Sequence, residues 1–256
     1  MSLIRRILEH LRTQNWIAIG LELIVVVVGI FLAFQVDRWY EQTRLASEER
    51  DYLAALSEDF AATREVYVRV RDRHIDATKS AVTLLSYQVG DSLDLSHEEF
   101  YALLSDIQLI RTADVRRGSY DFLISSGKIA VIQDERLRRQ MSEYFAKVDG
   151  TSSDMTDDLR SYWRDTFEPY AQRNIDHVAL MQAVHRRDNM KLRPTYPLDQ
   201  FHEIIGTGEF EAIVSDKWHL SGDLVAHYEA RIKEVEAIEL LLTKSLTRVP
   251  SGNGSD

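Results

Sequence analysis

The sequence has no cysteine and only four prolines in 256 residues. Without cysteine, the chain can form neither a disulfide framework nor a thiol-based catalytic or metal site. The first proline is Pro169, and nowhere do polar and apolar residues alternate over a sustained stretch, as they do in half-buried β-strands. These absences favour an all-α fold.

The chain also lacks the common motifs of nucleotide-binding and hydrolytic enzymes. It contains no G-x-x-x-x-G-K-[ST], G-x-G-x-x-G, H-E-x-x-H or G-x-S-x-G sequence and no EF-hand loop. Its net charge of −10 argues against nucleic-acid binding, which needs a basic face. We therefore expect a protein that is not an enzyme, with no cofactor and no nucleic-acid partner.

One long apolar run stands out near the N-terminus. Residues 16–34 include thirteen Leu, Ile, Val or Phe residues. As a helix this run covers roughly 28 Å, close to the hydrocarbon thickness of a bilayer. The apolar residues favour insertion by roughly 4–8 kcal/mol, whereas the single charge, Glu22, costs at most about 3 kcal/mol. We therefore expect a transmembrane helix over residues 16–35, in contact with a lipid bilayer.

A cleaved signal peptide is the competing interpretation of this run. Such a peptide has an apolar core of roughly 7–15 residues, followed by small residues in an A-x-A-like pattern. The run here is longer, and residues 33–39 after it contain no such pattern. We therefore favour an uncleaved, single-pass anchor.

The flanking residues indicate the orientation of the span. Lys and Arg counts tie at three on each side, so these counts alone do not decide it. Residues 1–15, however, have the pattern of a basic amphipathic helix, which suits an anionic cytoplasmic leaflet. Its apolar stripe comprises Leu3, Ile4, Ile7, Leu8 and Leu11. We expect residues 1–15 in the cytoplasm and the C-terminal domain outside it.

Residues 36–248 have the pattern of one domain of long helices. From Asp37 to about Gln88 there is no Pro or Gly, and the apolar positions recur at strict 3–4 spacing, as in a seam for a partner helix. The span is expected to continue straight into this helix. The predicted seam comprises Leu53, Leu56, Phe60, Thr63, Tyr67, Val70, His74, Ala77, Ala81 and Leu84.

Local signals predict further helices in the middle of the domain. After a break at residues 90–92, Ser96 and Glu99 form a capping-box pattern for a helix to about residue 110. Gly127 is the predicted C-terminal cap of a short helix that starts at about residue 119. Asp134 is predicted to cap a longer helix that reaches about residue 170.

A Pro-containing loop at residues 193–197 precedes the last part of the domain. The final helix is predicted over about residues 216–246, and residues 249–256 are expected to be a disordered tail. Altogether the sequence predicts an all-α protein, in which one N-terminal transmembrane helix continues into an antiparallel long-helix bundle. The apolar stripe of the final helix comprises Val225, Tyr228, Ile232, Val235, Ile238 and Leu242.

The span and its exit resemble the start of a family of uncharacterised bacterial single-span membrane proteins, catalogued as a domain of unknown function. That family tends to read Gly-Glu-Ile, an aliphatic run, Gly-Ile-Leu-Ile-Ala-Leu-Gln, and then Asn-Asn-Trp-Asn-Glu. Residues 120–144 are similar to a middle stretch of the family. The matching residues of the span are Glu22, Gly29, Ala33, Gln35, Trp39 and Glu41.

The chain departs from the family pattern at Asp37 and Arg38, where the family favours Asn-Asn, and at Tyr40. The resemblance implies an anchored helical domain of bacterial origin, and therefore a place in the bacterial inner (cytoplasmic) membrane. It implies no reaction, ligand or catalytic residue.

Three metal-competent side chains share one stripe of the last predicted helix. His219, Asp223 and His227 are spaced i, i+4 and i+8. Residues eight apart on a helix are separated by about 12 Å, too far to share one tetrahedral ion. We therefore interpret them as a solvated polar face and predict no metal site.

Two other polar features have ordinary structural interpretations. His74 occupies a seam position, where a partly buried histidine bonded to a neighbour is preferred over a pH switch. A cluster of aspartates is interpreted as a solvated turn rather than a cation site. The cluster comprises Asp149, Asp154, Asp157 and Asp158.

The sequence singles out a transmembrane association face. Glu22, Val26, Gly29 and Ala33 fall on one side of the span, and Gly29-x-x-x-Ala33 is a small-x-x-x-small pattern that permits close helix approach. An acid on that face suggests a homo-oligomer formed through the span, or a polar partner. The alternative is a Glu22 carboxylate that is protonated or snorkels to the inner interface.

These observations leave three functions open. The leading one is a membrane-anchored, non-catalytic interaction or scaffold protein, which binds an unknown protein partner or itself outside the cytoplasm. The second is a sensor-like bundle that binds a small ligand and signals through a partner, because the predicted cytoplasmic segment has only fifteen residues. The third is a metal-dependent enzyme that uses the last helix.

Overall fold

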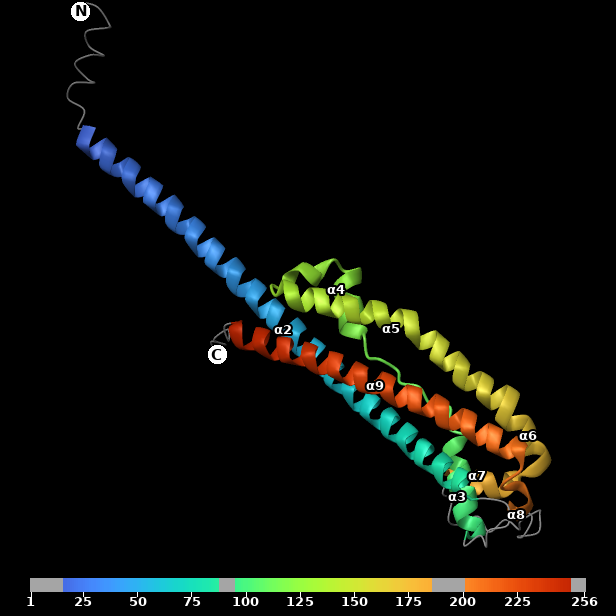
Figure 1. Cartoon of the computed structure of the whole chain (residues 1–256). Helices are drawn as coiled ribbons and strands as arrows, with labels where there is room; N and C mark the ends of the chain where they lie inside the picture. The colour runs from blue at the N-terminus through green and yellow to red at the C-terminus, as the bar shows by residue number, and fades with distance from the viewer. Residues whose placement is uncertain (1–15, 88–94, 186–200, 250–256) are drawn as a thin grey trace, which may run out of the picture. The chain divides into compact units, whose positions relative to one another are not determined.

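The computed structural model describes residues 16–87, 95–185 and 201–249 of the chain (Figure 1). The predictions for residues 1–15, 90–92, 193–197 and 250–256 lie outside the described residues. Within the described ranges all regular elements are helices, so the all-α prediction is confirmed.

The helices are named here in chain order. They are α2 (Trp16–Ser86), α3 (His97–Ile107), α4 (Gly118–Ser125), the 3₁₀ helix η1 (Lys128–Val131), α5 (Glu135–Ser161), the π-helix η2 (Tyr162–Phe167), α6 (Glu168–Asn174), α7 (His177–His185), α8 (Phe201–Ile204) and α9 (Gly208–Arg248).

The chain divides into two units, one made of Met1–Asp51 and Arg248–Asp256, the other of Tyr52–Thr247. This division lies inside α2, between Asp51 and Tyr52. The domain boundary predicted from hydropathy lies earlier, after residue 35. The first unit contains one helix segment long and apolar enough to cross a membrane. Between residues 21 and 34 every Leu, Ile, Val and Phe side chain is exposed, from 48% for Val28 to 65% for Val25.

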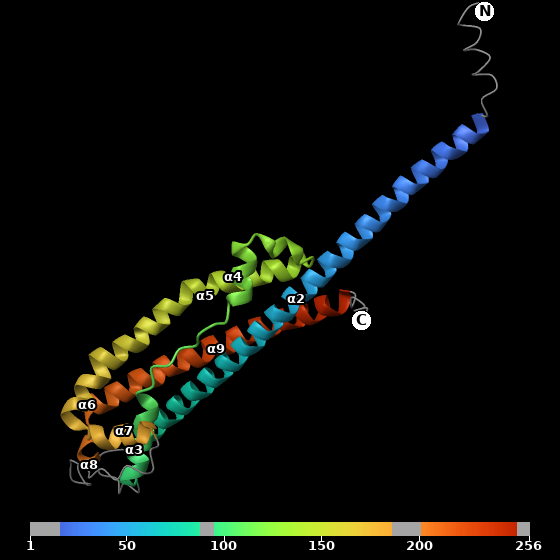
Figure 2. The ribbon, with the colours of Figure 1, turned by 180° about the vertical axis from the view of Figure 1, so that it is seen from behind.

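The second unit is built on three long helices: residues 52–86 of α2, α5 and α9, which lie side by side in Figures 1 and 2. Arg64 on α2 pairs with Glu239 on α9 at 2.9 Å. Tyr67, further along α2, lies against Tyr228, which comes earlier on α9. The two helices are therefore antiparallel, as predicted.

Helix α5 is antiparallel to α9 as well. Near its start, Asp134 accepts a hydrogen bond from the Ser245 hydroxyl at 3.4 Å, and further along Lys147 pairs with Glu234 at 2.7 Å. All ten residues of the predicted seam on α2 are buried, none more than 7% exposed. The seam therefore forms the centre of the bundle.

Aromatic side chains fill two regions of this core. Phe60 on α2 lies between Tyr144 and Phe145 of α5, with ring centroids 5.5 and 5.7 Å away. Elsewhere in the unit α3 packs on α7, and Phe100 of α3 contacts Phe201 at 4.9 Å between centroids. Such rings contribute large buried apolar areas.

The predicted helix caps are confirmed. Ser96 Oγ accepts from the Glu99 backbone N–H at 3.2 Å, and the Glu99 carboxylate accepts from the Ser96 N–H at 2.9 Å. Gly127, with φ of 70°, follows α4 in the left-handed region that glycine adopts readily. Asp134 accepts from the Leu137 N–H at 3.0 Å.

The last helix begins earlier than predicted. Helix α9 starts at Gly208 rather than at about residue 216, because Thr207 caps it by accepting from the Phe210 N–H at 3.3 Å. On its stripe Leu224 is buried and Val225 only half-buried, so the predicted position was wrong by one residue.

The aspartate cluster was also misassigned. Asp149, Asp154, Asp157 and Asp158 lie on α5, which continues through Gly150, and not in a turn. Asp149 pairs with Arg117 at 2.5 Å.

Candidate functional site

Residues 108–117, called the connector below, join α3 to α4 without forming a helix or strand. The connector runs lengthwise along the bundle beside α9 (Figures 1 and 2). A non-helical segment leaves backbone N–H and C=O groups without partners inside the segment, and burying them unpaired is costly. Side chains of α2 and α9 supply the missing partners.

Two side chains of α2, Thr63 of the seam and the nearby Asp59, accept hydrogen bonds from the connector and from the start of α4. Thr63 Oγ1 accepts from the backbone N–H of Arg116 at 3.1 Å. The Asp59 carboxylate accepts from the N–H of Ser119 at 2.9 Å, in the first turn of α4. Asp59 therefore acts as an N-terminal cap supplied by a different helix.

The third side chain from α2 is His74, which is fully buried. Its Nε2–H donates to the carbonyl oxygen of Arg111 at 2.9 Å, and its ring stacks on that of Tyr228. Burial lowers the pKa of His74 to about 4, aided by the positive charge of Lys217 and opposed by the bond to Arg111. The ring is therefore neutral at neutral pH. The predicted hydrogen bond of this seam histidine is confirmed, but the ring is fully rather than partly buried.

Helix α9 holds the connector from the opposite side. Lys217 is fully buried; its Nζ donates to the carbonyl oxygen of Leu109 and lies 5.2 Å from the centroid of the Tyr162 ring. Burial lowers the pKa of Lys217 to about 7. The hydroxyl of Tyr228 accepts from the N–H of Ala113 at 3.2 Å.

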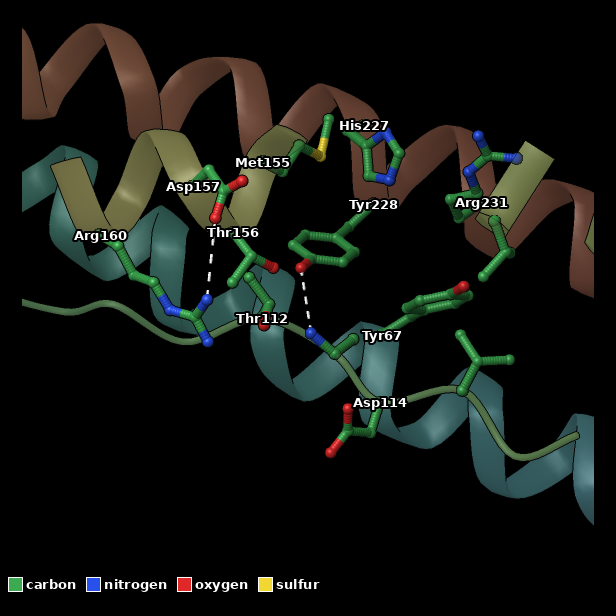
Figure 3. A pocket seen from close by; sticks show the side chains of 13 residues that line it. Tyr67, Thr112, Asp114, Met155, Thr156, Asp157, Arg160, His227, Tyr228 and Arg231 are labelled. Atoms are coloured by element: carbon green, nitrogen blue, oxygen red, sulfur yellow. Dashed lines mark hydrogen bonds and ion pairs between the residues drawn. The ribbon is translucent and has the colours of Figure 1, made fainter. Parts of the chain in front are cut away.

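A cavity of about 410 Å³, called the α5–α9 cavity, lies beside the connector (Figure 3). Its volume is in the range of small-molecule pockets. The lining residues are Tyr67, Thr112, Ala113, Asp114, Val115, Val148, Met155, Thr156, Asp157, Arg160, His227, Tyr228 and Arg231.

The arginines of the α5–α9 cavity are paired with carboxylates. Arg160 lies 3.7 Å from Asp157 (Figure 3), and Arg231 lies 2.7 Å from Glu234. Burial, together with the charge of Arg231, lowers the pKa of His227, so this ring is neutral at neutral pH. The cavity therefore presents compensated charges.

The phenols of the α5–α9 cavity are held in the protonated form. The hydroxyls of Tyr67 and Tyr144 lie 2.9 Å apart, and burial raises the pKa of both. Burial also raises the pKa of Tyr228 to about 12. Protonated phenols suit hydrogen bonding to a ligand better than nucleophilic attack.

A second cavity, of about 530 Å³, shares Thr112 and Asp114 with the first and is called the α2–α7 cavity. Its lining is formed by α2, α3, α7 and the connector. The lining residues are Val66, Arg69, Val70, Arg73, Ser105, Asp106, Leu109, Arg111, Thr112, Asp114, Ala183 and Val184.

The three metal-competent residues of the last helix are not brought together. His219 and Asp223 lie 3.8 Å apart with side chains 80% and 71% exposed, whereas His227 lines the α5–α9 cavity. Over residues 16–87, 95–185 and 201–249, no group of three or more His, Asp or Glu side chains is placed to hold a metal ion.

The predicted association face lies on α2 in the first unit. Glu22, Val26, Gly29 and Ala33 are all exposed, and a Cβ added at Gly29 would contact nothing within 4 Å. The face is therefore open to a neighbour, and its role stays a prediction.

Of the residues that bind the connector, the sequence indicated a hydrogen-bonding role for His74. It did not indicate such a role for Lys217 or Tyr228.

Comparison of the chain with protein-family models, curated proteins and solved structures found no match. The family resemblance of residues 20–41 therefore stays a prediction from the sequence.

Proposed function

We propose that this chain is a membrane-anchored, non-catalytic interaction protein of the bacterial inner membrane. In this proposal residues 16–35 of α2 span the bilayer, and the second unit binds a protein partner or a second copy outside the cytoplasm. The exposed apolar run of residues 21–34 carries the proposal. Removing each such side chain from water is worth about 1.5–3 kcal/mol, so the whole run strongly favours a lipid environment.

The use of the polar side chains around the connector supports a non-catalytic role. Asp59, Thr63, His74, Lys217 and Tyr228 each bind a backbone group of the connector or of α4. Side chains engaged in this way stabilise the fold, so replacing them is expected to lower the stability of the protein rather than to abolish a reaction.

Topology gives the first test of the proposal. A reporter that is active only outside the cytoplasm, fused after Asp256, is expected to be active in bacterial cells. A reporter that works only in the cytoplasm is expected to be silent at the same position. The reverse pattern would contradict the orientation inferred from residues 1–15.

Self-association through the span gives the second test. Close approach at Gly29 and Ala33 brings two helices into dispersion contact, and a protonated Glu22 adds an interhelical hydrogen bond worth about 0.6–2 kcal/mol. Gly29→Ile is therefore expected to weaken the signal in a transmembrane-helix dimerisation assay.

The matched control for this assay is Val27→Ile, because Val27 lies on a different face of the span. It is expected to keep the signal of the native span. Equal signals from the native span and both variants would reject the association face.

A sensor-like role is the second candidate function. It is favoured by the α5–α9 and α2–α7 cavities, both of which are lined in part by the connector. A ligand in either cavity would contact the connector, which is hydrogen-bonded to both α2 and α9.

A further inference from the structure

Three solvent-exposed arginines line the α2–α7 cavity. Arg69 and Arg73 stand one turn apart on α2, and Arg111 comes from the connector. Within the described residues none of the three forms an ion pair, whereas Arg64 and Arg71 of the same helix do. Like charges one turn apart on a helix repel each other. A bound anion would remove that repulsion.

The carboxylates of this cavity do not neutralise the arginines. Asp106 accepts a hydrogen bond from the Ser80 hydroxyl at 2.7 Å, which ties α3 to α2. Asp114 is exposed on the connector. Three arginines and two aspartates therefore line the cavity, and because the hydroxyl of Ser80 leaves the charge of Asp106 in place, one positive charge is in excess, in a chain whose net charge is −10. The cavity has a local surplus of positive charge.

The rest of the lining is largely apolar. The buried Lys217 binds the carbonyl of Leu109, one of these apolar residues, and so holds this part of the lining in place. The volume of about 530 Å³ suits a small molecule. The apolar lining residues are Val66, Val70, Leu109, Ala183 and Val184.

We propose that the α2–α7 cavity binds a small organic anion, a carboxylate or phosphate ester with an apolar part. The planar guanidinium groups offer paired N–H donors that match the oxygens of either anion. The apolar part packs against the valine and alanine side chains. This proposal goes beyond the interaction role and does not rest on it.

The test uses the full chain in phosphatidylcholine nanodiscs, titrated with hexanoate and with hexyl phosphate. Ligand-observed NMR gives the Kd, and empty nanodiscs provide the background. Saturable binding of both anions is expected. Hexylammonium, which has the same apolar part and the opposite charge, is expected not to bind.

The variant Arg69→Gln/Arg73→Gln is expected to raise the Kd for both anions about tenfold or more, because two charge-assisted hydrogen-bond partners are lost. The matched control is Arg136→Gln/Arg139→Gln, which removes the same charge from exposed positions of α5 outside the cavity. Its Kd is expected to stay close to that of the native chain. Circular dichroism melting checks that both variants fold.

Several outcomes would overturn the proposal. They are the absence of saturable binding, equal weakening by the two double variants, and binding of hexylammonium as tight as that of hexanoate. Inorganic phosphate that binds as tightly as hexyl phosphate would reject the apolar part of the site. If the first double variant fails to fold, Arg111→Gln replaces it, with the same expected rise in Kd. None of these measurements depends on a protein partner, so their failure leaves the interaction role untouched.

Discussion

Replacing Lys217 with alanine is expected to lower the free energy of unfolding by about 3–5 kcal/mol. The change empties the space of a fully buried side chain and leaves the Leu109 carbonyl without its donor. Lys217→Met keeps most of the buried volume and removes a buried charge, so its loss is expected to stay below about 2 kcal/mol. Urea denaturation of the full chain in detergent micelles, followed by circular dichroism, measures both values.

The same lysine predicts a pH dependence. Its pKa is about 7 in the folded chain, against a model-compound value of 10.5, so the folded state binds fewer protons between these two pH values. Stability therefore rises with pH from about 7 to 10.5, by up to about 5 kcal/mol. The groups around Lys217 are Tyr162, the Leu109 carbonyl and His74.

Lys217→Met is expected to lose this rise, and Lys233→Met, at an exposed position of α9, is expected to keep it. Equal slopes in the native chain and in Lys217→Met would show that Lys217 is not the group responsible.

Acidification is expected to destabilise the bundle through His74. Its pKa is lowered from 6.5 to about 4, so its contribution is complete above pH 6.5 and is lost as the pH falls to 4. The loss is up to about 3 kcal/mol. Protonation would place a second N–H on Nδ1, which is buried without a hydrogen-bond partner in the described structure, close to the charge of Lys217.

His74→Leu isolates this effect, because the carboxylates that titrate in the same range are retained. At neutral pH this variant is expected to lose about 1–3 kcal/mol, since the Arg111 carbonyl loses the donor that His74 supplies. Between pH 6.5 and 4 it is expected to lose less stability than the native chain. The control His219→Leu, at an exposed site, should follow the native curve. A His74→Leu curve parallel to the native one would contradict the assignment.

The sequence was sufficient for the features that depend on local patterns. The 3–4 spacing from Leu53 to Leu84 identified the buried face of α2, because a helix places such residues on one side. Ser96, Gly127 and Asp134 were recognisable as caps because their partners lie within a few residues. The start of α9 was missed because the polar residues Asp216 and Lys217 interrupt its apolar pattern.

The candidate site was not predictable because its contacts are not local. A lysine in a helix pattern is normally exposed, and only the position of the Leu109 carbonyl explains why Lys217 is buried. Arg69 and Arg73 have the pattern of ordinary surface residues, and they line a cavity only because the connector and α7 lie beside them. Thr63 is a polar residue in a mostly apolar seam, so the sequence marks it as unusual. Its partner, the backbone N–H of Arg116, was not predictable because no sequence pattern marks that position.

The hydrogen bonds that hold the connector also set an order for folding during synthesis. Leu109 and Ala113 find their partners 108 and 115 residues later, on α9. Until then α2 holds the connector and the start of α4 through residues 37–60 positions earlier in the chain, and α5 holds Arg117 through Asp149. Contacts of such long sequence separation form late, because closing the intervening loop costs entropy. The α5–α9 cavity is therefore completed only when α9 docks, because His227, Tyr228 and Arg231 line it, and a chain that ends before Gly208 lacks it.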